Sequence, residues 1–401
     1  MISFNISLRS QYARNQLPEV GLPLANSPGA LPPADTTVVH PRQWLWWDIL
    51  LPLLVTRILF TIVGFYAVNS MTLSAAAPLS YTVPRHAWLT SWARWDAVWY
   101  LRIVRDGYFY TPGQQSSVAF FPLYPALMKL GGHVLGQNEV GWLLSGVLIS
   151  NLLLLVAMVY LWKLVRLDFD EGTAARAVLY ALIVPWTLFL SAVYPMSLIL
   201  AIALAGFYYA RKGNWGITAV IAALAPIARP DGVLLVGGLL FEYLRQRQFQ
   251  WRQICWNVAP LLILPALTIS GWLAYLHVRF GDALAFVHVQ KYWPSYSVRT
   301  SLGDWDGLVG ILAAGLGAAL LIYGRKKIHS SYMVYALMQW LLIVSAPRLT
   351  SAPRFMLVLF PIYIVLALAG RNERFDRLWV PISMGAATVM YLRFSLCYFI
   401  G

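Results

Sequence analysis

Long apolar runs separated by short polar turns make up most of this chain. About 20 apolar residues are enough for one membrane-spanning helix, and by this criterion the sequence predicts about 11 transmembrane helices. The segments 214–228 and 232–245 are short and contain or adjoin proline. The expected helices cover residues 45–68, 141–165, 173–192, 196–211, 214–228, 232–245, 254–277, 304–324, 331–347, 355–370 and 378–399.

The composition agrees with this pattern. Hydrophobic residues make up 59% of the chain and charged residues only 11%, whereas a soluble domain carries roughly 25% charged residues. The mean hydropathy is +0.63. A soluble core cannot absorb so much apolar sequence, so the prediction is an all-α polytopic membrane protein.

The net charge of +14 would suggest a nucleic-acid partner in a soluble protein. Here more than half of the basic residues fall in the short turns on one side of the predicted bundle, such as GRKK at 324–327. That distribution follows the positive-inside rule and places the N-terminus in the cytoplasm. With no nucleic-acid-binding signature in the sequence, we expect no nucleic-acid partner.

The same threading divides the chain into two parts. Residues 1–43, rich in Pro, Gly, Ala and Asn, are expected to form a flexible cytoplasmic tail with no catalytic role. Residues 44–401 form the membrane domain, with a long outer loop at 69–140. Cys255 and Cys397 are placed near opposite faces of the membrane, so a disulfide between them is not expected.

The outer loop contains SWARWDAVWYLRIVRDGYFY at 91–110. A helix over 91–106 would be amphipathic and would lie in the membrane interface. Its aromatic face would carry Trp92, Trp95, Trp99 and Ile103, and its basic face Arg94, Arg102 and Arg105.

Asp96 breaks this pattern, because it falls in the middle of the aromatic face. A carboxylate there is costly unless it is paired, protonated or next to a wet cavity. Asp96 has no basic residue three or four positions away, so we expect it to line a polar pocket. Asp106 follows Arg102 by four residues and is expected to form a structural ion pair with it.

The segment RWDAVWYLRIVRDGY, followed by AFFPLYP at 119–125, resembles the start of the glycosylphosphatidylinositol mannosyltransferase II family and its prokaryotic relatives. Further matches come in order along the chain, over about residues 44–361. They are PWTLFLSAVYPMSLIL at 185–200, ARPDG at 228–232, FGDALAFVHVQKYW at 280–293 and SAPRFMLVLFP at 351–361.

This resemblance implies a class C glycosyltransferase (GT-C) fold, with interfacial helices in the first outer loop. It also implies transfer of a hexose, mannose first among them, from a polyprenyl-phosphate carrier to a hydroxyl acceptor on the non-cytoplasmic face. Asp96 then takes the position of the family's general base. The chain departs from the family pattern at Pro195 and Met196, where an acidic residue is expected; this puts acceptor recognition in doubt.

Arginines on the outer side are candidates for the carrier phosphate, because a guanidinium stays charged and binds phosphate in a fork. Arg229 and Arg354 come first, with a local Arg229–Asp231 pair and headgroup anchoring of Arg354 as the alternatives. The run Phe120 to Pro125 forms either a substrate groove or a rigid connector, and His288 is either sugar-binding or structural. Further expected substrate-binding residues are Arg94, Trp95, Tyr100, Arg102, Phe121, Tyr124, Asp231, Gln290 and Lys291.

No cofactor or metal is expected, because arginines can supply the charge that phosphate departure needs. The expected partners are the polyprenyl-phosphate sugar donor, a hydroxyl acceptor such as a glycolipid, and membrane lipids. Two other functions stay open. A lipid or glycolipid transporter would place charged residues and broken helices at the midplane, and an inactive relative would serve as a membrane scaffold.

Overall fold

The computed structural model describes residues 43–74, 86–250, 252, 256–293, 305–347 and 349–400. Residues 1–42 of the tail predicted at 1–43, and Cys255, lie outside these residues, while Cys397 is buried and has a free thiol. All secondary structure in the described ranges is helical.

The longest apolar helices are the best candidates for membrane spans. Within the described residues, four helices are long and apolar enough to cross a membrane, or five if a pair bent by 81° is one span. The pair is Leu349–Val358 with Pro361–Ala369 (α17). The four are Leu45–Ser70 (η1 and α2), Glu139–Val165 (α6), Trp256–Phe280 (η7 and α11) and Trp305–Gly324 (α14).

The other predicted spans correspond to shorter helices or to a more polar one. The helix boundaries lie close to the predicted ones in most cases, but the number of spans stays a prediction. These helices are Glu171–Ile183 (α7), Met196–Arg211 (α8), Trp215–Ala228 (α9), Val233–Gln246 (α10), Ser330–Val344 (α15) and Glu373–Ser395 (α18).

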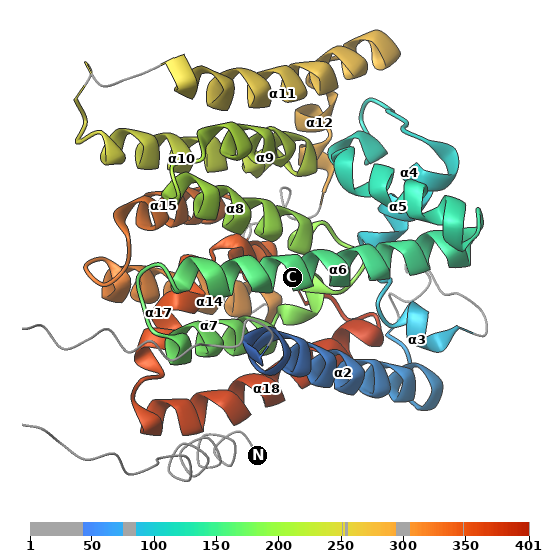
Figure 1. Cartoon of the computed structure of the whole chain (residues 1–401). Helices are drawn as coiled ribbons and strands as arrows, with labels where there is room; N and C mark the ends of the chain where they lie inside the picture. Colours follow the sequence, from blue (N-terminus) through green and yellow to red (C-terminus); the bar gives the residue numbers. More distant parts are fainter. Residues whose placement is uncertain are drawn as a thin grey trace, which may run out of the picture. The chain divides into compact units, whose positions relative to one another are not determined.

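The helices pack side by side, and several of the pairs in contact are not consecutive in the sequence. Helix α11 packs on α9, α9 on α8, and α8 on α6, as Figure 1 shows from the top of the view downward. Helix α18 packs on α2 at the bottom of the same view. The short helices α3 (Ala87–Thr90), α4 (Ala97–Asp106) and α5 (Leu123–Leu135) gather at one end of the long helices.

Two predicted helices are interrupted by proline. The predicted helix 173–192 ends at Ile183, because Pro185 lacks an amide hydrogen and forces Val184 into an extended conformation (ψ 143°). The predicted helix 355–370 is likewise broken at Leu359, two residues before Pro361, which is the first residue of α17. Both predictions were wrong in treating a continuous apolar run as one straight helix.

Arg57 stabilises the first of these breaks from inside α2. Its Nη2 donates to the carbonyl oxygen of Leu182 at 3.1 Å and to Oγ1 of Thr187 at 2.9 Å. The first bond satisfies a carbonyl group at the end of the interrupted helix, and the second ties that end to the segment after the break. The segment that follows, up to Pro195, is thereby held in place, and it carries Tyr194 toward α4.

The predicted helix over 91–106 is shorter than expected. Helix α4 begins at Ala97, with Asp96 as its N-cap, and Trp95 has a positive φ of 55° that no helix allows. Arg94 therefore does not belong to a basic helix face. It is fully buried and donates from Nε to the carbonyl oxygen of Ser395.

Candidate functional site

Asp96 forms an ion pair with a residue from the other end of the sequence. Nη1 of Arg354 lies 2.6 Å from Oδ2 of Asp96, and the two side chains are 12% and 27% exposed. No described residue donates a hydrogen bond to Oδ1 of Asp96. The carboxylate thus has one oxygen held by a guanidinium and the other available to a ligand.

The helix geometry explains how Asp96 comes to face Arg354. Asp96 sits in the N-cap position of α4 but makes no side-chain capping bond. Its backbone N–H donates instead to the hydroxyl of Tyr194 at 3.1 Å, and that hydroxyl donates to the carbonyl oxygen of Arg94, also at 3.1 Å. One buried phenol therefore fixes the backbone on both sides of Trp95 and leaves the Asp96 carboxylate free for another role.

Two arginines share one aromatic ring at this site. The guanidinium carbons of Arg354 and Arg229 lie 5.0 Å and 4.8 Å from the ring centroid of Phe355. Nε of Arg354 is buried and has no hydrogen-bond partner among the described residues. Two cations at a single ring, one with an unused buried donor, form a place where an anionic group would be stabilised.

Arg229 is already held by a neighbouring carboxylate. Its Nε and Nη2 donate to the two oxygens of Asp231 at 2.8 and 3.1 Å, in the local pair that the sequence left open as an alternative. Its Nη1 contacts the sulfur of Met196. The position at which the chain departs from the family pattern is therefore part of this site, and Asp231 supplies the carboxylate for Arg229.

Tyr100 lies beside the same charges. Its side chain is buried, with its ring against Phe120 and Tyr124, and its electrostatic neighbours include Asp96, Arg229 and Arg354. Burial, with the charge of Asp96, raises the pKa of the Tyr100 phenol well above its ordinary value. At neutral pH this phenol stays protonated, so it can donate a hydrogen bond but cannot act as a base.

A second polar cluster lies where the segment after α4 meets α12 (Ala285–His288). Tyr110 donates to Oδ2 of Asp282 at 2.9 Å, and Nδ1 of His288 lies 2.7 Å from the same oxygen. The His288 hydrogen bond holds the pKa of Asp282 below its ordinary value of 3.8. A carboxyl group with a lowered pKa stabilises the fold at any pH above its ordinary pKa. This stabilisation is lost as the pH falls through the lowered pKa. The cluster therefore stays intact at neutral pH.

Several predicted residues have structural partners. Tyr124 is fully buried and donates to the carbonyl oxygen of Gly146, and Phe121 packs on Trp272. Trp95 donates from Nε1 to the carbonyl oxygen of Tyr398. Arg102 is exposed and lies over the ring of Phe109, 4.2 Å from its centroid. The roles of these residues in substrate binding stay predictions.

Asp106 forms a structural pair, as expected, but with a different partner. Both of its oxygens accept hydrogen bonds from Arg105 at 3.0 Å, and Arg105 also pairs with Glu139 at 2.8 Å. The predicted partner Arg102 was wrong, because the side chain of Arg102 turns toward Phe109 instead.

Tyr194 and Asp282 were not among the predicted site residues. Both lie inside segments that carried the family resemblance, PWTLFLSAVYP and FGDALAF. The signal was therefore present, but a tyrosine or an acid within an apolar segment does not reveal its distant partner.

A model of the family described as Mannosyltransferase (PIG-V) matches residues 47–298, more than half of the chain. The chain belongs to the PIG-V mannosyltransferase family. The apolar helices of the described residues are those of a multi-pass membrane protein. A comparison with curated proteins gave no match.

Solved structures similar to this PIG-V family member include an ArnT and an archaeal oligosaccharyltransferase. ArnT from Cupriavidus metallidurans bound to undecaprenyl phosphate is 16% identical, with a TM-score of 0.51 over 86% of this chain and 76% of that one. The oligosaccharyltransferase of Archaeoglobus fulgidus in the apo form is 11% identical, with a TM-score of 0.48 over 90% of this chain. This chain spans 57% of the length of that oligosaccharyltransferase. At this identity, the similarity to ArnT shows that the two chains share a fold.

Proposed function

We propose that this protein transfers mannose from a polyprenyl-phosphate carrier to a hydroxyl acceptor, with Asp96 as the general base. The observation that carries the proposal is the Asp96–Arg354 pair at 2.6 Å, beside the ring that Arg354 shares with Arg229. A carboxylate for the acceptor proton and guanidinium groups for the carrier phosphate are the two groups that this reaction needs.

The base acts through the oxygen that the ion pair leaves open. Arg354 holds Oδ2 of Asp96, so an acceptor hydroxyl can donate its hydrogen bond to Oδ1. As the hydroxyl oxygen forms its bond to the anomeric carbon, its proton passes to Asp96. General-base assistance of this kind contributes typically about 10²–10⁴-fold to a rate.

The arginines act on the leaving group. The bond between the anomeric carbon and the carrier phosphate breaks, its electron pair goes to the phosphate oxygen, and the phosphodiester becomes a monoester with more negative charge. Nε of Arg354 is buried and unused, so it can donate to that oxygen without first giving up the bond to Asp96. Attack and departure take place on opposite faces of the sugar, so its anomeric configuration inverts.

The lipid-linked donor and the side of the membrane are parts of the same proposal. ArnT, the neighbour with a comparable fold, was solved with undecaprenyl phosphate bound, which supports a polyprenyl-phosphate carrier here. The basic residues clustered in turns such as GRKK at 324–327 support a cytoplasmic location for those turns. The loop with Asp96 then lies on the non-cytoplasmic face.

The function is tested by donor choice. Purified protein in lipid vesicles is given labelled mannose either as polyprenyl-phosphate mannose or as a nucleotide sugar, with a glycolipid extract as acceptor and EDTA present. We expect label to move to the acceptor from the lipid-linked donor only, and EDTA to leave the rate unchanged because arginines supply the charge. Transfer from the nucleotide sugar alone would contradict the proposal.

The transporter alternative makes a different prediction for the same vesicles. A transporter would move a labelled lipid across the bilayer without changing its chemistry. The family match favours transfer, and a carboxylate paired beside two arginines is a reactive arrangement rather than a conduction path.

Tyr194 is expected to act as a positioning residue for Asp96. Tyr194→Phe keeps the ring under Arg354 but removes the hydroxyl that binds both Asp96 N–H and the Arg94 carbonyl. A neutral hydrogen bond contributes about 1 kcal/mol, so we expect kcat to fall about 5–10-fold, with the donor KM little changed. The matched control is Tyr160→Phe, which removes a hydroxyl bonded to Tyr209. An unchanged kcat in Tyr194→Phe would refute the positioning role.

A further inference from the structure

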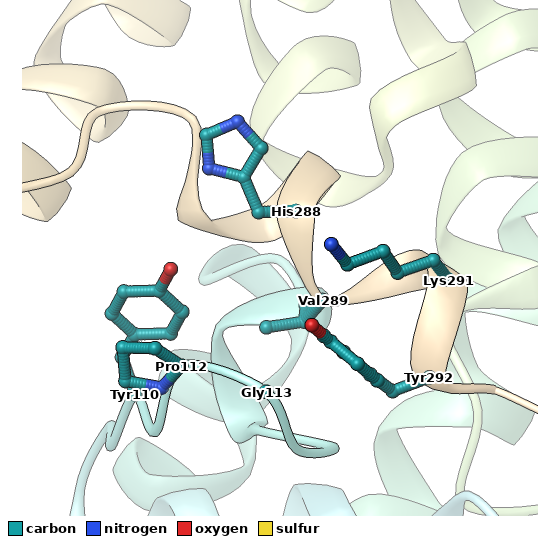
Figure 2. Close-up of a pocket in the computed structure, with 7 residues that line it drawn as sticks. All are labelled: Tyr110, Pro112, Gly113, His288, Val289, Lys291 and Tyr292. Carbon is teal, nitrogen blue, oxygen red and sulfur yellow. The ribbon is translucent and has the colours of Figure 1, made fainter.

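A cavity of about 220 Å³ lies between the segment after α4 and the segment that contains α12 and η8 (Gln290–Tyr292). Figure 2 shows its lining, with Tyr110 and Pro112 on one side and His288, Val289, Lys291 and Tyr292 on the other. Pockets for drug-sized ligands measure about 300–1,000 Å³. This cavity therefore suits a smaller group, such as a single sugar ring.

The walls of the cavity are tied together by hydrogen bonds. Asp282 accepts from Tyr110 on one side and binds Nδ1 of His288 on the other. Nε2 of Gln115 donates to the carbonyl oxygen of Tyr292 at 3.2 Å. The two segments are far apart in the sequence, and these bonds fix the two walls of the cavity relative to each other.

The lining carries one charge with no counter-ion. The ammonium of Lys291 and the hydroxyl of Tyr292 both point into the cavity in Figure 2. The Lys291 Nζ lies over the Tyr292 ring, 5.1 Å from its centroid, and no described acidic residue forms an ion pair with it. By contrast, the nearby carboxylate of Asp282 is occupied by Tyr110, His288 and the backbone N–H of Leu284. An anionic ligand would supply the missing charge.

An aromatic surface connects the cavity to the start of α4. Trp293 directly follows Tyr292, and its ring centroid is 5.5 Å from that of Trp99 and 5.9 Å from that of Phe120. Trp99 lies in the first turn of α4, three residues after Asp96. Aromatic rings of this kind pack against the apolar faces of sugars. A saccharide held in the cavity can therefore continue toward Asp96.

We propose that this cavity binds an anionic sugar of the acceptor, a hexose bearing a phosphate or a carboxylate, with the anion on Lys291. The acceptor then extends over Trp293 and Trp99, so that its reacting hydroxyl meets Asp96. This inference rests on the proposed function, and it names the acceptor as an acidic saccharide or a glycolipid with an acidic sugar head.

The test measures binding without requiring catalysis. Saturation-transfer NMR is recorded on the purified full-length chain, as wild type and as Asp96→Asn, with mannose 6-phosphate, mannose or inorganic phosphate. We expect mannose 6-phosphate to bind at least about 10-fold more tightly than either of the other two. Lys291→Met is expected to lower that affinity about 10-fold, because the ammonium supplies a charge-assisted hydrogen bond to the phosphate. Lys326→Met, an exposed lysine between α14 and α15, is the control.

Each outcome separates this inference from the proposed function. Lys291-dependent binding of mannose 6-phosphate supports the inference even if no transfer is detected. Equal binding of mannose, equal binding of inorganic phosphate, or full affinity in Lys291→Met would overturn it. Thermal unfolding of Lys291→Met shows whether that variant is folded. Tyr292→Phe keeps the ring and the Lys291 charge and is expected to weaken binding by only a few-fold.

Discussion

Asp96→Asn is expected to reduce mannosyl transfer by about 10³-fold, because the amide cannot accept the hydroxyl proton. Asparagine has nearly the same shape as aspartate, so the loss would come from the missing base rather than from a changed cavity. The measurement is the initial rate of transfer from polyprenyl-phosphate mannose by purified protein. Donor binding should persist, because the guanidinium of Arg354 is still present.

Two further variants make this result specific. Asp106→Asn removes an exposed carboxylate on the same helix, paired with Arg105, and should leave the rate within about two-fold of wild type because surface pairs contribute little. Asp96→Glu keeps a carboxylate but shifts it by one methylene, and should retain more activity than Asp96→Asn. Thermal unfolding of each variant separates a lost fold from a lost base. Wild-type rates in a folded Asp96→Asn protein would exclude Asp96 as the base.

Arg354→Met is expected to lower kcat by about 10²–10³-fold, the range seen when one charge-stabilising donor is removed from an active site. Arg354 contacts Asp96 and has a buried Nε to offer the departing phosphate, so its loss affects both partners of the reaction. Arg354→Lys keeps a positive charge but lacks the fork, and an intermediate rate is expected. The control is Arg377→Met, which breaks an exposed pair with Glu373.

The double variant tests whether the two residues act as one unit. If Asp96 and Arg354 work together, the fold-loss of rate in Asp96→Asn/Arg354→Met should be much smaller than the product of the two single fold-losses. Removing one partner leaves a partly buried charge without compensation, whereas removing both does not. Strictly multiplicative losses would mean that the ion pair has no part in catalysis.

The sequence predicted the positions of most helices, since an apolar run flanked by charged turns has few other structures open to it. It failed where proline interrupts such a run. Val184 and Leu359 end helices although the hydropathy continues, because the hydropathy of a residue carries no information on a missing amide hydrogen. The start of helix α4 was predicted six residues too early for a similar reason. The hydrophobic pattern of the sequence does not reveal the positive φ of Trp95.

For the site, the sequence identified individual residues but not their pairs. Asp96 stood out as a carboxylate in an aromatic pattern, and Arg354 as an outer arginine, yet 258 positions separate them in the chain. Only packing of the broken segment around Arg354 against the start of α4 brings them together. Arg94 was predicted at the surface, and its burial against Ser395 depends on a second tertiary contact, with the end of α18.

The most direct test of the account is the stereochemistry of a single transfer. Purified wild-type protein is given β-linked polyprenyl-phosphate mannose and the acceptor, and the anomeric configuration of the new linkage is read by NMR. One displacement with Asp96 as base predicts an α-linked product that is lost in Asp96→Asn. A β-linked product would mean two displacements through a covalent intermediate, and would contradict the role assigned to Asp96.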